Sequence, residues 1–211
     1  MRPAHAHQYR RPAGARPRPA LLAVSRRPPA EAGTPGFTLI ELLMVLVITS
    51  LLLGLGSPSM REAIEGYQLR STANELVAAL HFTRNEAIAR GTVVLLTPAG
   101  DGTDWSQGWQ AFIDRDGNRR PGSGEPMLLR HGPAAAALRI WSRFSANTAP
   151  LYIAYNSAGR SCKAPTGLGA HFGTVSLQAG VQQRNIKINM LGRVRLCDPA
   201  REATGCTPAS S

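Results

Sequence analysis

The hydrophobic and polar positions of this chain follow three successive patterns. The first is a nearly unbroken apolar run from Phe37 to Gly56, in which Glu41 is the only charged side chain. At a rise of about 1.5 Å per residue, about twenty helical residues match the roughly 30 Å hydrocarbon core of a bilayer. The run therefore predicts a transmembrane helix over residues 37–57.

The second pattern begins after Pro58. Apolar residues recur there mostly at steps of three and four, with charged residues between them, which is typical of an amphipathic helix. The apolar positions are Ile64, Tyr67, Leu69, Leu76, Leu80, Ala87 and Ile88. We expect the helix to continue over residues 58–91 and to end near Arg90, with Gly91 as its C-cap.

The third pattern consists of short segments of β-forming residues, most of them separated by turn residues. The expected strands are 92–97, 108–113, 126–130, 137–141, 151–155, 174–177, 186–190 and 193–197. A chain of 211 residues has room for one anchor and one globular domain. The prediction is an α+β fold, in which the long N-terminal helix packs on an antiparallel β-rich head formed by residues 92–211.

Residues 1–36 carry seven arginines and a single acid, Glu31, in a run rich in proline and alanine. Such a composition cannot form a hydrophobic core. We expect residues 1–36 to be a basic leader that is cleaved off. Because positive segments stay on the cytoplasmic side of a membrane, a single-pass topology would place the head in the periplasm.

Glu41 needs a partner, because a carboxylate within a membrane helix costs about 2.5 to 3.5 kcal/mol. Cleavage between Gly36 and Phe37 would create one, since the new α-amine lies four residues from Glu41 and can pair with it on a neighbouring subunit. An ordinary anchor or secretory signal is the alternative interpretation, and it leaves Glu41 unexplained.

The order of a basic leader, Gly36, Phe37-Thr38-Leu39-Ile40-Glu41 and about twenty apolar residues resembles the type IV pilin and pseudopilin family. The resemblance implies that a prepilin peptidase cuts after Gly36 and that Phe37 is N-methylated. It also implies that Glu41 guides assembly with other pilins in a filament that starts from the inner membrane. Pro58 matches a proline that bends the first helix in many members.

Further segments resemble the GspH/FimT branch of minor pilins. These segments are Leu80-His81-Phe82-Thr83-Arg84-Asn85-Glu86-Ala87-Ile88, Gly108-Trp109, Phe112-Ile113-Asp114 and Asp116-Gly117-Asn118. The resemblance implies one of two roles. One sub-branch caps the pseudopilus of type II secretion, and the other belongs to type IV pili, where some members bind DNA for uptake.

Charge is distributed unevenly along the chain. Residues 37–126 hold seven basic and ten acidic side chains, whereas residues 127–211 hold ten basic side chains and only Asp198 and Glu202 as acids. This asymmetry predicts an electropositive surface that can attract a polyanion. A solvated, arginine-rich face is the alternative explanation.

Gly192-Arg193-Val194-Arg195 is the motif in this basic half that favours DNA. In a strand, Arg193 and Arg195 share one face about 6.6 to 6.8 Å apart, close to the repeat of backbone phosphates. Gly192 is expected to let a phosphate approach the main chain. The motif resembles the Gly-Arg-x-Arg motif of DNA-binding members, and we expect Lys187, Arg184 and Arg160 to extend the patch.

No platform of aromatic residues for single strands is evident in the sequence, so we expect the partner to be the backbone of double-stranded DNA. The alternative is an edge strand that its charges protect from pairing.

The three cysteines suit an oxidising compartment and leave one thiol over. Cys197–Cys206 is the favoured bridge and Cys162–Cys197 is its rival. No metal site is expected, because the cysteines form no CxxC pair and have no histidine nearby.

Four oxygen-bearing residues imitate the spacing of a calcium loop: Asp114, Asp116, Asn118 and Glu125. Arg119 stands where an EF-hand requires glycine, so we expect a polar hairpin connection that holds no metal. The histidines are scattered and no nucleophile motif occurs. We therefore expect a non-enzymatic protein without cofactors.

Together these observations predict a minor type IV pilin of the FimT kind, incorporated at a pilus tip and able to capture DNA for natural transformation. A GspH-type pseudopilin of the type II secretion system is the alternative. A membrane-anchored periplasmic enzyme is a remote third candidate.

Overall fold

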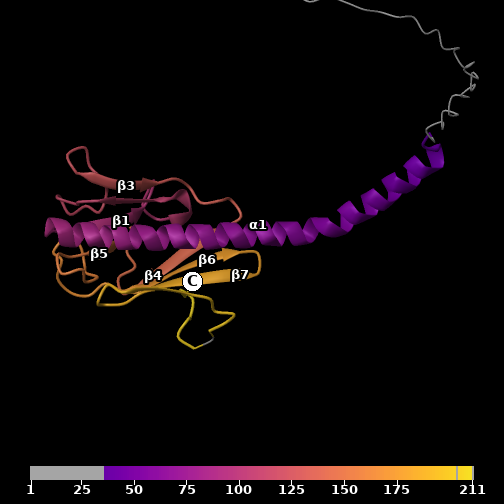
Figure 1. Ribbon diagram of the computed structural model, residues 1–211. Coiled ribbons are helices and arrows are strands. Elements are labelled where there is room, and N and C mark those ends of the chain that lie inside the picture. Colours follow the sequence, from indigo (N-terminus) through magenta and orange to yellow (C-terminus); the bar gives the residue numbers. More distant parts are fainter. Residues whose placement is uncertain (1–35, 203, 211) are drawn as a thin grey trace, which may run out of the picture. The chain divides into compact units, whose positions relative to one another are not determined.

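The computed structural model describes residues 36–202 and 204–210 (Figure 1). The expected leader of residues 1–36 thus lies outside the described residues, except for Gly36. The chain divides into two compact units, Met1–Leu46 and Val47–Ser211, and the β-rich head belongs to the second.

Helix α1 extends over Leu39–Arg90, so the two expected helical segments form one helix of 52 residues. Thr38 caps its start, because Thr38 Oγ1 accepts a hydrogen bond from the amide of Glu41 at 3.3 Å. Glu41 therefore lies in the first turn, where the helix dipole favours a carboxylate. The dipole stabilises Glu41 within its own subunit, in addition to any partner that cleavage would create.

The helix ends as expected. Gly91 has φ 66°, its amide donates to the carbonyl of Ile88, and the amide of Thr92 donates to the carbonyl of Ala87, both at 3.3 Å. These two bonds form a Schellman motif, which requires the left-handed conformation that glycine tolerates best. The predicted C-cap at Gly91 is confirmed.

Large apolar side chains from Phe37 to Leu53 are exposed, with exposed fractions of 49% or more. In the part of the chain that the structure describes, no helix has both the length and the apolarity needed to cross a membrane. The transmembrane assignment of residues 37–57 stays a prediction.

The head contains two four-stranded antiparallel sheets. The first has the strand order β3-β2-β1-β5 and the second β4-β6-β7-β8. Their strands are β1 (Val94–Pro98), β2 (Trp109–Phe112), β3 (Met127–His131), β4 (Arg139–Phe144), β5 (Ile153–Tyr155), β6 (Gly173–Ala179), β7 (Gln182–Ile188) and β8 (Val194–Cys197). A short 3-10 helix, η1, covers Trp105–Gln107. The α+β fold is confirmed. A strand occurs at each of the eight expected places, although β7 begins and ends earlier in the chain than the predicted 186–190.

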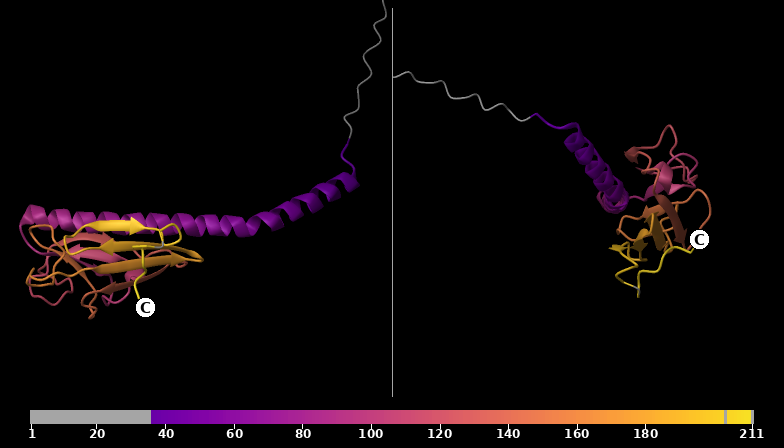
Figure 2. Two further views of the ribbon diagram at one scale, coloured as in Figure 1. Left: turned by 90° about the horizontal axis from the view of Figure 1, so that it is seen from below. Right: turned by 90° about the vertical axis from the view of Figure 1, so that its right-hand side faces the viewer.

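The main core forms where α1 lies along both sheets (Figures 1 and 2). Leu69, Leu76 and Leu80 of α1 are fully buried. They belong to one cluster with residues of both sheets, including Leu96 of β1 and Ile186 of β7. A second cluster, which includes Leu95 and Phe112, covers the other face of the first sheet. Because every buried residue of both clusters lies between Leu69 and Ile188, residues 59–211 contain the complete core.

Candidate nucleic-acid interface

The basic motif lies in the hairpin of β7 and β8. Asn189 closes this hairpin, because its Oδ1 accepts from the amides of Leu191 at 3.0 Å and Arg193 at 2.9 Å. The amide of Gly192 donates to the carbonyl of Asn189 at 2.9 Å. These bonds make residues 189–193 a turn, so β7 ends at Ile188 and the predicted strand over 186–190 was placed too far along the chain.

The second sheet has an inner face and an outer face, because side chains alternate along a strand. The inner face carries Ile186 and Ile188, which belong to the core with α1. The outer face carries Lys187 and Arg195, whose Cα atoms are directly paired across β7 and β8. Arg193 has the same parity as Arg195, and all three basic residues line one pocket of about 550 Å³. The structure thus brings Lys187, Arg193 and Arg195 together.

The three cations differ in their partners. The guanidinium of Arg195 forms an ion pair with the carboxylate of Glu202. Lys187 Nζ donates to Thr207 Oγ1 at 2.9 Å, a neutral acceptor that leaves the ammonium charge in place. Within the described residues no carboxylate pairs with Arg193, which is exposed. Arg193 is therefore the cation of this group most available to an external anion.

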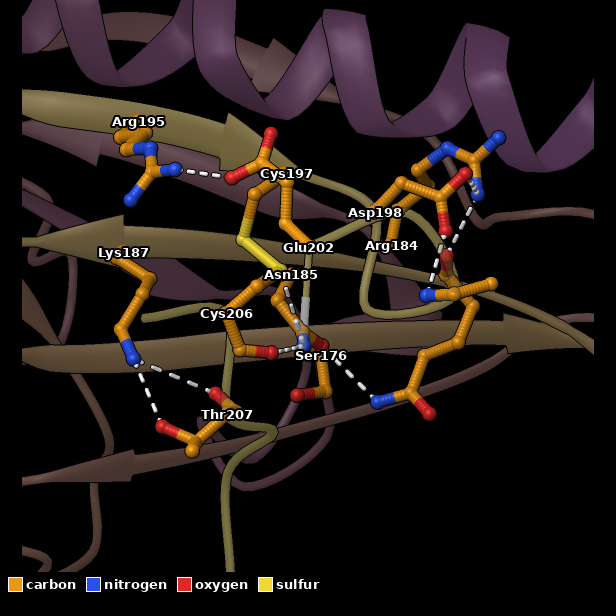
Figure 3. Close-up of a disulfide and its surroundings, with 12 residues drawn as sticks. Ser176, Arg184, Asn185, Lys187, Arg195, Cys197, Asp198, Glu202, Cys206 and Thr207 are labelled. Atoms are coloured by element: carbon orange, nitrogen blue, oxygen red, sulfur yellow. Dashed lines mark hydrogen bonds and ion pairs between the residues drawn. A yellow bond between two sulfur atoms is a disulfide. The ribbon is translucent and has the colours of Figure 1, made fainter. Parts of the chain in front are cut away.

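Arg184 lies on the opposite face of the sheet from Lys187, since the two differ in parity on β7. Its guanidinium pairs with Asp198 at 2.9 Å (Figure 3). Both side chains are largely buried, with exposed fractions of 16% and 18%. The expectation that Arg184 extends the basic patch is therefore wrong. Its charge is neutralised within the fold.

Arg160 is exposed and lies beside the β7–β8 turn, where it lines a neighbouring pocket with Met190 and Leu191. It stays a predicted extension of the patch, across the turn from the main group.

Gly192 has a structural role that differs from the expected one. The residue is buried with φ 76°, and a Cβ atom there would lie 2.2 Å from the carbonyl oxygen of Gly159. Gly192 is thus required by the turn and by close packing against Gly159. The space into which a phosphate was expected to approach is filled by the protein itself.

The cysteines pair as favoured: Cys197 is bonded to Cys206, with their Cα atoms 5.9 Å apart, and Cys162 is free and buried. The rival bridge between Cys162 and Cys197 is thereby excluded. Figure 3 shows the bridge linking β8 to the C-terminal segment. Burial raises the pKa of the Cys162 thiol to about 11, so this residue is neutral and a poor nucleophile at pH 7.

We call residues 204–210 the C-terminal tail, and it crosses the outer face of the second sheet. The side chain of Asn185 donates to the carbonyl of Cys206 at 2.8 Å. The amide of Ala209 donates to Ser176 Oγ at 2.8 Å, and Trp141 Nε1 donates to the carbonyl of Ala209 at 2.9 Å. Sequence reasoning missed this arrangement. The sequence signal for it was the polar side chains of Ser176 and Asn185 on the outer face of the sheet. Polar residues there are equally suited to contact with solvent.

The loop that imitates a calcium site connects β2 and β3, as expected for a polar hairpin. Carboxylate oxygens of Asp114, Asp116 and Glu125 lie within 4.8 Å of one another. Backbone amides already occupy them: Glu125 accepts from Arg115 at 2.6 Å and from Gly122 at 2.9 Å, and Asp114 accepts from Gly117 at 2.9 Å. Burial raises the pKa of Asp114. The acids organise the loop.

His171 is fully buried between the rings of Phe144 and Tyr152. Its Nε2 lies 3.1 Å from the carbonyl oxygen of Tyr152, which requires a proton on that nitrogen. Burial lowers the pKa of His171, so the neutral ring is the form that the fold accommodates. This histidine packs between Phe144 of β4 and Tyr152, which precedes β5.

Comparisons with known proteins identify the family models and a relative that this chain matches. A family model described as type II transport protein GspH matches residues 72–192. A second, described as the prokaryotic N-terminal methylation motif, matches residues 35–57. The pilin-like protein PilA1 of Thermus thermophilus is 31% identical over 163 residues, which cover 76% of this chain and 97% of that protein.

Two solved structures are also similar. The type IV minor pilin FimU of Pseudomonas aeruginosa is 20% identical, with a TM-score of 0.47, and the match covers 68% of this chain and 98% of that one. The minor pseudopilin EpsH from the type 2 secretion system of Vibrio cholerae is 16% identical, with a TM-score of 0.43, over 63% of this chain and 98% of that one.

Proposed function

The chain belongs to the type IV pilin and pseudopilin family, in its GspH branch, and from this membership we propose that it is a FimT-like minor pilin that binds double-stranded DNA. The observation that carries the DNA proposal is the grouping of Lys187, Arg193 and Arg195 around one pocket on the outer face. Contacts from such cations to phosphates supply most of a sequence-independent affinity.

The N-terminal part of the proposal concerns processing and assembly. The methylation motif over residues 35–57 supports cleavage after Gly36 and methylation of Phe37 by a prepilin peptidase. Glu41 then assists docking with other pilins, in a filament that starts from the inner membrane and displays the head outside. Mass spectrometry of the protein from cells with and without the peptidase tests this step. A mature chain that retains residues 1–36 contradicts it.

The DNA proposal is tested by titrating a labelled duplex with residues 59–211 at several salt concentrations. The Arg193→Ala/Arg195→Ala variant is expected to bind roughly tenfold more weakly and to show a salt slope shallower by about 1.8, since two phosphate contacts are removed. If the parent head fails to bind even at low salt, the DNA proposal must be abandoned.

A pseudopilin of type II secretion is the second candidate, because the matching family model carries that description. Deletion of the gene separates the two functions. Loss of DNA uptake with intact protein secretion supports the pilin, and loss of secretion alone supports the pseudopilin. In both cases the protein acts as a filament subunit without catalytic activity.

A further inference from the structure

The outer face of the second sheet has basic residues along both of its edges. Strands β4 and β8 are the edge strands in the order β4-β6-β7-β8. Arg139 and Arg143 of β4 are paired with Gln178 and Thr174 of β6. They alternate with Ile140 and Phe144, which belong to the core. Arg139 and Arg143 therefore project from the outer face, the same face as Lys187 and Arg195.

We define the β4 row as Arg139 and Arg143. The β8 row is Arg195 of β8 together with Arg193, which directly precedes β8, and Lys187, the partner of Arg195 on β7. The β4 and β8 backbones are three strand spacings apart, which is about 14 Å at 4.7 to 4.9 Å per spacing. Within the β4 row, four residues of extended chain separate the two Cα atoms by about 13 Å. The strand registers place Arg143 level with Lys187 and Arg195, and Arg139 and Arg193 lie in opposite directions from that level. The two rows therefore follow the two edges of the face and are staggered along the strands.

The C-terminal tail fills the gap, since it is bonded to Ser176 on β6 and to Asn185 on β7. Residues 204–210 contain no charged side chain, so the tail itself adds no side-chain charge to the face. Between the tail and the β4 row lies a pocket of about 600 Å³, whose lining includes Arg139, Arg143, Gln183 and Pro208. The β4 row is therefore accessible from the outer face and is not covered by the tail.

The β4 row has no ion-pair partner among the described residues. Both arginines are exposed, and in residues 36–202 and 204–210 no carboxylate forms an ion pair with either of them. By contrast, Arg195 of the β8 row is partly neutralised by Glu202. On electrostatic grounds, the β4 row offers two guanidinium groups that an external phosphate can engage without displacing a partner.

The geometry points to a DNA interface that spans the whole outer face, in which the β4 row contacts one strand of a duplex and the β8 row contacts the other. The major groove of B-DNA is about 12 Å wide, comparable to the separation of about 14 Å between the β4 and β8 backbones. The neutral tail then faces the groove while each row meets a line of phosphates. This inference rests on the proposed function and adds Arg139 and Arg143 to its binding residues.

The test compares three double variants in residues 59–211 and, in neutral detergent, in the full chain. They are Arg139→Ala/Arg143→Ala, Arg193→Ala/Arg195→Ala, and the control Arg115→Ala/Arg120→Ala. The control removes the same charge from two exposed arginines of the β2–β3 loop. Near-ultraviolet circular dichroism verifies that each variant is folded, and anisotropy of a labelled 20-base-pair duplex measures affinity and its dependence on salt.

We expect the β4-row variant to bind the duplex roughly tenfold more weakly, with a salt slope shallower by about 1.8. The control is expected to change the slope much less. A single strand of the same length should be less sensitive to the β4-row variant, because it cannot contact both rows across a groove.

The outcomes separate the two proposals. If the parent does not bind, the proposed function fails. If the parent binds and only the Arg193→Ala/Arg195→Ala variant is impaired, the proposed function stands and the two-row interface is overturned. The two-row interface is also overturned if the β4-row variant binds DNA no worse than the control variant. A vesicle sedimentation assay gives one more such outcome: the β4-row variant loses binding to anionic phosphatidylserine vesicles and keeps its affinity for DNA.

Discussion

The guanidinium of Arg195 is paired with the carboxylate of Glu202, a residue of the loop that the disulfide closes. A phosphate that binds Arg195 must displace this carboxylate or share the cation with it. Glu202 is therefore an internal competitor of DNA in the proposed interface.

Glu202→Gln is expected to strengthen duplex binding roughly two- to fivefold, the range that corresponds to an exposed ion pair. Salt-dependent anisotropy measures the change. Glu62→Gln on α1 is the matched control, since it removes the same charge from an exposed position. If the gain persists when Arg195 is also replaced by alanine, Glu202 acts through general charge and the pairing is not the cause.

The Cys197–Cys206 bridge fastens the C-terminal tail to β8. The Cys197→Ser/Cys206→Ser variant should lose roughly 2 to 3 kcal/mol of unfolding free energy, as expected for a closed loop of this size, with nine residues of sequence separation. Urea denaturation of residues 59–211 provides the measurement. Cys162→Ala, which leaves the bridge intact, is the control for thiol removal. An unchanged midpoint in the double variant would show that hydrogen bonds alone hold the tail.

The Gly192→Ala variant tests whether this glycine is needed for the turn between β7 and β8 or for contact with phosphate. A left-handed φ of 76° and a clash with the carbonyl of Gly159 should destabilise the fold by about 1 to 3 kcal/mol. Gly132→Ala is the control, because a Cβ there meets nothing within 4 Å. Once binding is corrected for the folded fraction, duplex affinity should change little. A stable Gly192→Ala head that no longer binds DNA would restore the idea of direct phosphate approach.

The lowered pKa of His171 predicts that the unfolding free energy depends on pH. Burial lowers the pKa of His171 in the folded state below its ordinary value of 6.5, so the unfolded chain binds the proton more readily. The unfolding free energy should therefore fall as pH decreases below about 6.5, until the folded pKa is reached. Urea denaturation at pH 7.5, 6.5 and 5.5 measures this slope, which His171→Gln should flatten. An identical slope in the variant would assign the effect to other groups.

Periodicity located the elements, although burial follows it only in part along α1. Leu69, Leu76, Leu80 and Ala87 are fully buried as predicted, whereas Ile64, Tyr67 and Ile88 are exposed. The step of three and four residues identified α1, and its end at Gly91 followed from local chemistry. The strand over 186–190 was misplaced for a local reason. Ile186, Ile188 and Met190 alternate as a strand would, but the Asn189 side chain closes a turn and leaves Met190 exposed.

The site could be predicted only in part. Alternation predicted that Arg193 and Arg195 share one face, and both side chains line one pocket in the structure. The same count applied to β7 would have removed Arg184 from the patch. The pairing of Arg195 with Glu202 and of Lys187 with Thr207 depends on the path by which the tail returns over the sheet. Sequence spacing does not specify that path, because it is determined by bonds to Ser176, Asn185 and Trp141 from distant strands.

The position of the C-terminal tail has a practical consequence for purification. Ser210 lines the pocket beside Arg139 and Arg143, so an affinity tag fused after Ser211 would begin close to these arginines. A polyhistidine tag there would add titratable charge to the surface being assayed, and an acidic epitope would shield it. Binding measurements are best made with a removable tag ahead of residue 59, at the other end of the expressed chain.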